Sequence, residues 1–239
     1  MNMRKFWIKM NILYEKLMLL MFVAVLLIVI YGLYDSWYVF HNANDTSYLK
    51  YKPTVGESIP EDIPITDDMV AWITLDDTNI DYPVMQGEDN SKYLNINPYG
   101  EYALSGSIFL DSRNKADFSD AYSIVYGHHM EYGVMFGALD EYLDSSYLAS
   151  HSSGILLVGR DNVRSEKLRA FACSKVNVFE DEDFFNPEVQ DIDKLIREHA
   201  SVYDESVPKT GRILALSTCT EPVSQNRLIV FCYIYDETE

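Results

Sequence analysis

Three residues in the C-terminal part of the chain have side chains that together support acyl transfer: His128 in "YGHHM", Cys219 in "LSTC" and Arg227 in "RLIVFCYIY". A free thiol near pH 7 is only a few per cent thiolate, so a nucleophilic cysteine needs a base or a positive field nearby. A histidine can take up a proton and return it to a leaving amine, and a guanidinium can stabilise an oxyanion. The three residues therefore predict acyl-transfer chemistry. The alternative is that Cys219 is simply a small buried side chain and that the charged residue near it lies on the surface.

The other two cysteines, Cys173 and Cys232, fit a structural role. Side chains alternate between the two faces of a strand, so Cys232 points away from Arg227 in a regular strand over 227–235. We therefore expect Cys232 to be an inert core thiol, and Cys173 in "LRAFACSKV" to be another. An odd number of cysteines leaves at least one thiol unpaired within the chain.

The sequence offers no convincing metal site. His128 and His129 are neighbours at a predicted strand end, so their side chains diverge, and no zinc-type ligand spacing lies nearby. The acidic run "EDED" at 180–183 lacks the alternating ligands of a calcium loop and is expected to be solvated. No metal and no organic cofactor are predicted, and calcium dependence stays open.

The elements that position these residues are short apolar runs rich in β-branched and aromatic residues. They are separated by Gly, Asp, Asn or Pro and predict an all-β barrel or sandwich. The runs are "VAWITLDD", "IDYPVMQG", "GSIFLD", "YSIVYGHHM", "SGILLVG", "KLRAFACSKVNVF", "RILALSTC" and "RLIVFCYIY". Two helical insertions are expected, at 135–150 and at 186–201, the second with Asn186 as N-cap and Pro187 at the first helical position.

The N-terminal part predicts a membrane anchor. Residues 17–34 carry no charge and are long enough to cross a bilayer as a helix. No small-x-small cleavage site follows them, which indicates an uncleaved signal anchor. The basic residues before and at the edge of the span outnumber Glu15, so we expect residues 1–16 in the cytoplasm and residues 35–239 outside.

The composition limits the kinds of partner. The chain has 48% hydrophobic residues and 18 tyrosines, which favours a folded, strand-rich protein. Its formal net charge of −18 repels phosphate backbones, so a nucleic-acid partner is not expected.

Several motifs taken in order give the chain a resemblance to the sortase family, most closely to class B sortases. The resemblance covers roughly residues 57–235 and rests on "AWITLDDTNIDYPVMQGEDNSKYLN", "GSIFLDSRN", "YGHHMEYGVMFGALDEY" and "LSTCT", with Arg227 eight positions after Cys219. It implies a mostly β fold: a closed eight-stranded barrel at 57–239 with inserted helices, an N-terminal helical extension or stalk at 35–56, and one preceding transmembrane helix at 17–34.

Carried over by motif, the resemblance implies a role for each candidate. Cys219 is the nucleophile that attacks the Thr carbonyl of a sorting signal, His128 is the general acid and base, and Arg227 holds the substrate backbone and the oxyanion. Ser217 and Thr218 line the substrate groove. Class B enzymes commonly have Asn where this chain has His129, and we assign His128 because it follows Tyr126 and Gly127.

The resemblance also implies partners and a place in the cell. These are surface proteins with a C-terminal sorting signal of the Pro-x-Thr type, a lipid-linked peptidoglycan precursor that supplies an amine, and membrane lipid around 17–34. The alternatives are a pilin polymerase, a hydrolytic cysteine endopeptidase and a non-enzymatic binding module. A lid typical of pilin polymerases has no clear motif here, and 62–68 is its candidate location. Residues 208–211 spell a Pro-x-Thr-Gly string, which we expect to be a turn.

Overall fold

The computed structural model describes residues 3–43, 46–219 and 225–236, except for the side chains of Asn42 and Cys219. The chain divides into two compact units, residues 1–42 and residues 43–239.

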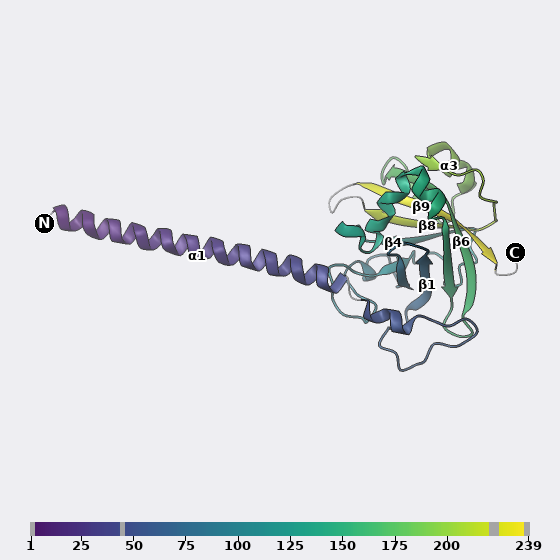
Figure 1. Ribbon diagram of the computed structural model, residues 1–239, viewed down its shortest axis with the longest axis horizontal. Helices are drawn as coiled ribbons and strands as arrows, with labels where there is room; N and C mark the ends of the chain where they lie inside the picture. Colours follow the sequence, from purple (N-terminus) through teal and green to yellow (C-terminus); the bar gives the residue numbers. More distant parts are fainter. Residues whose placement is uncertain (1–2, 44–45, 220–224, 237–239) are drawn as a thin grey trace. The chain divides into compact units, whose positions relative to one another are not determined.

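The first unit is one long helix, α1 (Met3–Ala43), which Figure 1 shows as a continuous coil. It is long and apolar enough to cross a membrane, and the predicted span at 17–34 lies inside it. The helix extends beyond that span at both ends because residues 3–43 contain no proline and a single glycine, Gly32. Residues 35–43 of the segment expected to be a stalk or helical extension thus belong to the C-terminal part of α1.

The second unit is a closed barrel. The strands are β1 (Met69–Leu75), β2 (Asp81–Met85), β3 (Ile108–Leu110), β4 (Tyr122–Gly127), β5 (Ser153–Val158), β6 (Arg164–Asn177), β7 (Val202–Tyr203), β8 (Ile213–Cys219) and β9 (Asn226–Asp236). They pair in the order β5-β1-β2-β3-β4-β8-β9-β6, and β6 pairs back with β5, so eight strands close on themselves. The β2–β3 and β4–β8 pairs are parallel, and β7 adds to β6 outside the ring. This strand order confirms the predicted eight-stranded barrel, whose arrangement can be followed in Figure 1.

The connections carry short helices. They are η1 (Ser47–Tyr51), η2 (Lys92–Leu94), η3 (Glu131–Gly133), η4 (Phe136–Leu143), α2 (Ser145–Ser150), η5 (Glu182–Phe185) and α3 (Ile192–His199). The helix expected over 135–150 is split at Asp144, whose backbone is extended and whose carboxylate caps α2 by accepting from the N–H groups of Ser146 and Tyr147.

The start expected for the second insertion is wrong. Asn186 forms a turn, in which its Oδ1 accepts from the N–H of Glu188, and it caps no helix. Helix α3 begins after Asp191, which adopts a left-handed backbone and accepts the N–H of Lys194. Two buried α3 residues, Ile192 and Ile196, belong to the apolar cluster that also contains Ile229, Phe231 and Tyr233 of β9, here called the outer cluster. The later cap allows both isoleucines to be buried there.

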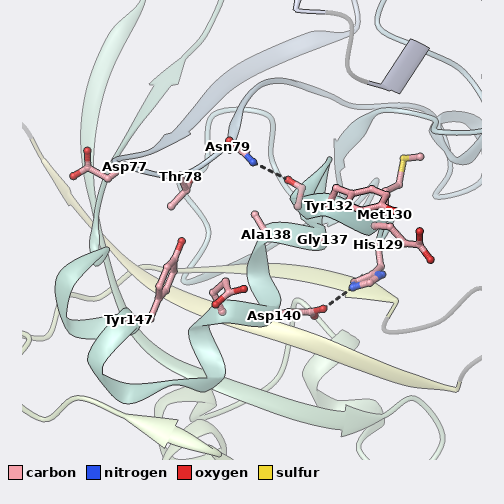
Figure 2. Close-up of a pocket in the computed structure, with 13 residues that line it drawn as sticks. Asp77, Thr78, Asn79, His129, Met130, Tyr132, Gly137, Ala138, Asp140 and Tyr147 are labelled. Carbon is pink, nitrogen blue, oxygen red and sulfur yellow. Dashed lines mark hydrogen bonds and ion pairs between the residues drawn. The ribbon is translucent and has the colours of Figure 1, made fainter. Parts of the chain in front are cut away.

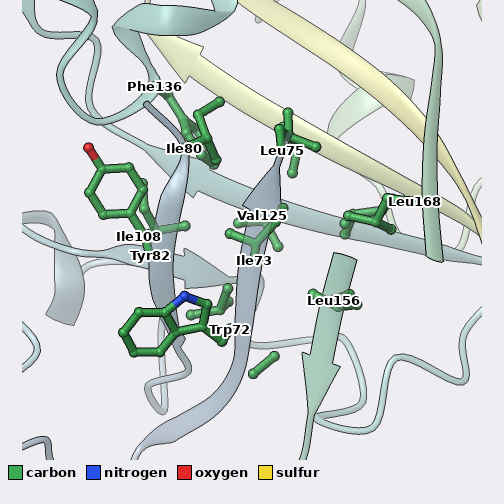
Figure 3. Close-up of a cluster of buried hydrophobic side chains, with 14 of the residues drawn as sticks. Trp72, Ile73, Leu75, Ile80, Tyr82, Ile108, Val125, Phe136, Leu156 and Leu168 are labelled. Atoms are coloured by element: carbon green, nitrogen blue, oxygen red, sulfur yellow. The ribbon is translucent and has the colours of Figure 1, made fainter. Parts of the chain in front are cut away.

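Strand alternation separates the apolar core into two clusters. From β9, Leu228, Val230, Cys232 and Ile234 lie in the larger cluster, part of which Figure 3 shows between β1, β2 and neighbouring strands. Ile229, Phe231 and Tyr233 lie in the other cluster, together with Ile192 and Ile196 of α3. The expected alternation along this strand is confirmed, and it leaves Arg227 on the face opposite to Cys232.

Candidate active site

The strand registers bring the three candidates to one end of the barrel. Cys219 ends β8 and pairs with Arg227 near the start of β9. Strand β4 runs parallel to β8 with Gly127 paired to Thr218, so His128 follows at the level of Cys219. Neighbouring strands lie about 4.8 Å apart, which puts the three backbones side by side although His128 is far from the other two residues in the sequence.

The His128 side chain is directed toward the loop that contains η2. Its Nε2 lies 2.7 Å from the main-chain oxygen of Leu94. A carbonyl oxygen can only accept, so this contact requires a hydrogen on Nε2. The backbone of His128 is also fixed, because its carbonyl accepts the N–H of Phe136 at 3.1 Å.

A groove of about 290 Å³ opens beside these residues. Its walls are mostly apolar, with a few polar groups, as ligand sites commonly are. Among the described residues that line it, Arg227 is the only one with a permanent charge. The lining residues are Asn90, Leu94, Phe109, Tyr126, Gly127, His128, Val178, Phe185, Ser217, Thr218 and Arg227.

Ser217 and Thr218 both line this groove and are almost fully buried. The hydroxyl of Ser217 has no hydrogen-bond partner within the part of the chain that the structure describes. A buried polar group without a partner is unfavourable, so a ligand that supplies one gains affinity.

His129 faces the other way, as the adjacent positions predict. Its Nε2 lies 2.7 Å from Oδ2 of Asp140, and Figure 2 shows this pair at a second cavity of about 460 Å³. His129 does not line the groove that contains His128 and Arg227. The two histidines therefore occupy different surfaces of the same loop.

The loop after the two histidines is tightly shaped. Tyr132 and Met135 have φ of 59° and 52°, in the left-handed region that non-glycine residues rarely adopt. The Met135 N–H donates to the hydroxyl of Tyr82 at 3.0 Å, which holds the loop against β2. This support helps to fix the backbone that leads from His128 to η4.

The remaining two cysteines are free thiols deep in the barrel. Burial raises the pKa of Cys232 to about 12, and burial, with a smaller effect of Asp140, raises the pKa of Cys173 to about 12. Both thiols stay protonated at neutral pH, which confirms their assignment as inert core residues.

Sequence reasoning did not identify the other groove residues. Asn90, Leu94 and Phe185 come from connections whose course depends on tertiary packing. The polar residues directly after strand β3, in "FLDSRN", mark a strand end of the kind that often serves a site, but none of residues 111–114 is in the groove lining. The region proposed for a lid, 62–68, contributes no described residue to the groove, and its Ile65 is buried in the core.

Comparisons with known proteins agree with this geometry. A family profile for the sortase domain matches residues 73–234. Sortase B of Listeria monocytogenes is 38% identical over 156 residues, which are 64% of this chain and 63% of that protein. Sortase B of Staphylococcus aureus is 33% identical over 178 residues, 71% of each chain.

Solved structures of class B sortases are also similar to this chain. A class B sortase of Streptococcus pyogenes, involved in pilus biogenesis, has a TM-score of 0.64 and 38% identity, covering 71% of this chain and 94% of that one. A complex of Staphylococcus aureus sortase B with a substrate has a TM-score of 0.63 and 30% identity, covering 72% and 82%. The chain belongs to the sortase family, and these relatives are class B sortases. It spans just under two thirds of the length of the Listeria protein that it matches.

Proposed function

We propose that this protein is a class B cysteine transpeptidase that cleaves a Pro-x-Thr-type sorting signal after Thr and transfers the acyl part to an amine. The observation that carries the proposal is the pairing of Cys219 with Arg227, with His128 at the same level on β4. Family membership supports the class of reaction.

In the first half-reaction, the Cys219 thiolate attacks the Thr carbonyl carbon and a tetrahedral oxyanion forms. Arg227 donates to this oxyanion or to the adjacent peptide backbone. The intermediate collapses by breaking the C–N bond, and His128 gives its proton to the departing amine. The product is a thioester between Cys219 and the Thr carbonyl.

In the second half-reaction, an acceptor amine attacks the thioester carbonyl while His128 takes one of its protons. The C–S bond breaks and the Cys219 thiolate is regenerated. An amine held in the groove outcompetes water because an oriented nucleophile has a high effective concentration. Ser217 and Thr218 contact the extended peptide, and the buried Ser217 hydroxyl gains a partner from its backbone.

The long apolar helix α1 supports a location at the membrane. We propose that this helix anchors the protein in the cell membrane with the N-terminus in the cytoplasm and the barrel outside. Surface proteins and lipid-linked peptidoglycan precursors then meet the enzyme at the same membrane surface.

A pilin polymerase is the second candidate, because the Streptococcus pyogenes relative is involved in pilus biogenesis. The amine acceptor of a pilin polymerase is a lysine side chain of another protein subunit. A hydrolytic endopeptidase differs from both in that water resolves the thioester. The nature of the acceptor therefore separates the three.

The test uses the full chain in detergent with a panel of Pro-x-Thr peptides. Mass spectrometry is expected to find an acyl adduct on Cys219 that lacks the residues after Thr and is absent from Cys219→Ala. Transfer of the adduct to a peptidoglycan-type amine supports wall anchoring, and transfer to a lysine peptide alone supports pilin assembly. Hydrolysis undiminished by any amine refutes transpeptidation, and the absence of an adduct with every peptide refutes the mechanism.

A further inference from the structure

Three groove residues from separate segments are hydrogen-bonded to one ion pair that is not itself part of the groove lining. Asn90 follows β2, Tyr126 belongs to β4, and Phe185 ends η5 in the long connection after β6. The pair is Asp111, directly after β3, and Arg113, whose NH2 lies 2.7 Å from the Asp111 Oδ2.

Asp111 is fully buried and makes an unusually large number of hydrogen bonds. Its Oδ2 accepts from Asn90 Nδ2 at 3.0 Å, from the Tyr126 hydroxyl at 3.0 Å and from Arg113 NH2. Its Oδ1 accepts from the main-chain N–H and from Nε of Arg113, both at 2.9 Å. A buried carboxylate is tolerated only when it is paired and hydrogen-bonded in this way.

The protonation states keep this arrangement intact. Burial by itself raises the pKa of the Asp111 carboxyl, but the hydrogen bonds and charge of Arg113 outweigh burial, and the net pKa is lowered. Burial, followed by the negative charge of Asp111, raises the pKa of Tyr126, so its hydroxyl remains a donor. Asn90 cannot rotate freely, because its Oδ1 also accepts the N–H of Ser112 at 2.8 Å.

Arg113 links the barrel to a second segment of the groove lining, the connection that contains η5. The NH2 group that contacts Asp111 also donates to the main-chain oxygen of Phe185 at 2.6 Å. One planar guanidinium thus holds a carboxylate with two nitrogens and a carbonyl of another segment at the same time. A lysine ammonium lacks this fork and cannot make the same set of contacts.

We propose that Asp111 and Arg113 are positioning residues that hold the two walls of the groove at a fixed separation and so control how tightly the peptide substrate binds. This role rests on the proposed function, since it assumes an extended peptide in the groove. Neither residue contacts the reacting atoms. Disturbing the pair moves Asn90, Tyr126 and Phe185 but leaves the registers of Cys219 and Arg227 unchanged. The effect therefore falls on KM more than on kcat.

The test compares Arg113→Lys with a matched control, Arg164→Lys. Arg164 also contacts a buried carboxylate two residues away, with its Nε 2.9 Å from Oε1 of Glu166, and also donates to a distant carbonyl, that of Asp117. The arginines are similarly exposed, at 53% for Arg113 and 47% for Arg164. The control pair lies at the other end of the barrel, because Glu166 pairs with Asp236 of β9, about 30 Å along the strand from Arg227.

Two measurements are made on the full chain in detergent. Steady-state kinetics use the Pro-x-Thr peptide that the unmodified protein cleaves fastest. The Arg113→Lys variant is expected to raise KM roughly tenfold, the equivalent of one charge-assisted hydrogen bond, with kcat within about twofold. The second measurement is the hydrogen exchange of the main-chain N–H groups of residues 178–190. In this segment the N–H of Phe184 donates to the main-chain oxygen of Asp181, and the N–H of Asn186 donates to that of Asp183. Exchange there is expected to accelerate in Arg113→Lys alone.

The outcomes separate the positioning role from the proposed function. Equal KM values for the two variants, with peptide cleavage intact, overturn the positioning role while the transpeptidase proposal stands. Unchanged exchange over 178–190 in Arg113→Lys also overturns it, because the guanidinium then does not hold that wall. If the unmodified protein forms no acyl adduct, the proposed function fails, and the exchange measurement alone decides whether the pair holds the walls.

Discussion

Replacing Gly137 by alanine adds a methyl group where the structure has no room for one. An ideal Cβ at this position lies 1.9 Å from the main-chain oxygen of Met130. Figure 2 shows Gly137 at the start of η4 beside the loop that contains Met130. An ordinary contact begins at 3.4 Å, so the two backbones must separate by about 1.5 Å.

This displacement reaches His128, the proposed general acid and base, through one hydrogen bond. Phe136, the residue before Gly137, donates its N–H to the carbonyl of His128. Overpacking of this kind costs about 1 to 3 kcal/mol, which lowers the Tm of a domain of this size by roughly 2 to 12 °C. Misplacing a catalytic group by about 1 Å costs on the order of a hundredfold in rate.

The assay measures kcat/KM for peptide cleavage and Tm for Gly137→Ala and for Gly211→Ala. Gly211 is a suitable control because its added Cβ meets no atom within 4 Å. We expect Gly137→Ala to lose about a hundredfold in kcat/KM while remaining folded at 25 °C, and Gly211→Ala to stay within about threefold. A value within threefold for Gly137→Ala would refute the inference that this contact positions His128.

Three further predictions follow from the site. His129→Asn removes a contact with the half-exposed Asp140, so kcat/KM should change less than about threefold and the free energy of unfolding by less than about 1 kcal/mol. A hundredfold loss of activity would identify His129 as the catalytic histidine. At about pH 8 iodoacetamide should label the native chain once, on Cys219. A pKa of about 12 leaves only about one Cys232 thiol in ten thousand ionised at this pH. A second adduct on the folded chain would contradict the burial of the core thiols. The folded pKa of Asp111 lies below its ordinary value of 3.8, so its ionised form contributes stability above that pH, and this contribution is lost as the pH falls through the folded pKa. Asp111→Asn should lower Tm near pH 6 and flatten the fall of Tm in acid, and an unchanged acid profile would argue against the ion pair.

The amino-acid sequence determined the features that depend on local pattern. The apolar run at 17–34 lies within α1 because a bilayer-length helix needs only composition and length. The alternation along residues 227–235 correctly divided β9 into two faces, because side chains of any regular strand alternate. The family motifs identified the class of barrel, and the closed ring of eight strands confirms it.

Helix boundaries were predicted less well because local signals compete. Asn186 with Pro187 is a good N-terminal signal, but α3 starts at Ile192, after the Asp191 cap. The choice depends on which turn buries Ile192 and Ile196 against the outer cluster, and this packing is not visible in the local sequence.

Tertiary structure alone decided how the groove is built. The pairing of Cys219 with Arg227 joins two consecutive antiparallel strands and is consistent with their spacing of eight residues, whereas the position of His128 follows from the long-range parallel pairing of β4 with β8. The Asp111–Arg113 pair joins Asn90, Tyr126 and Phe185 across nearly a hundred residues of chain. Hydrogen bonds of this kind depend on distances of about 3 Å between separate segments, which only the closed barrel and its packed connections can fix.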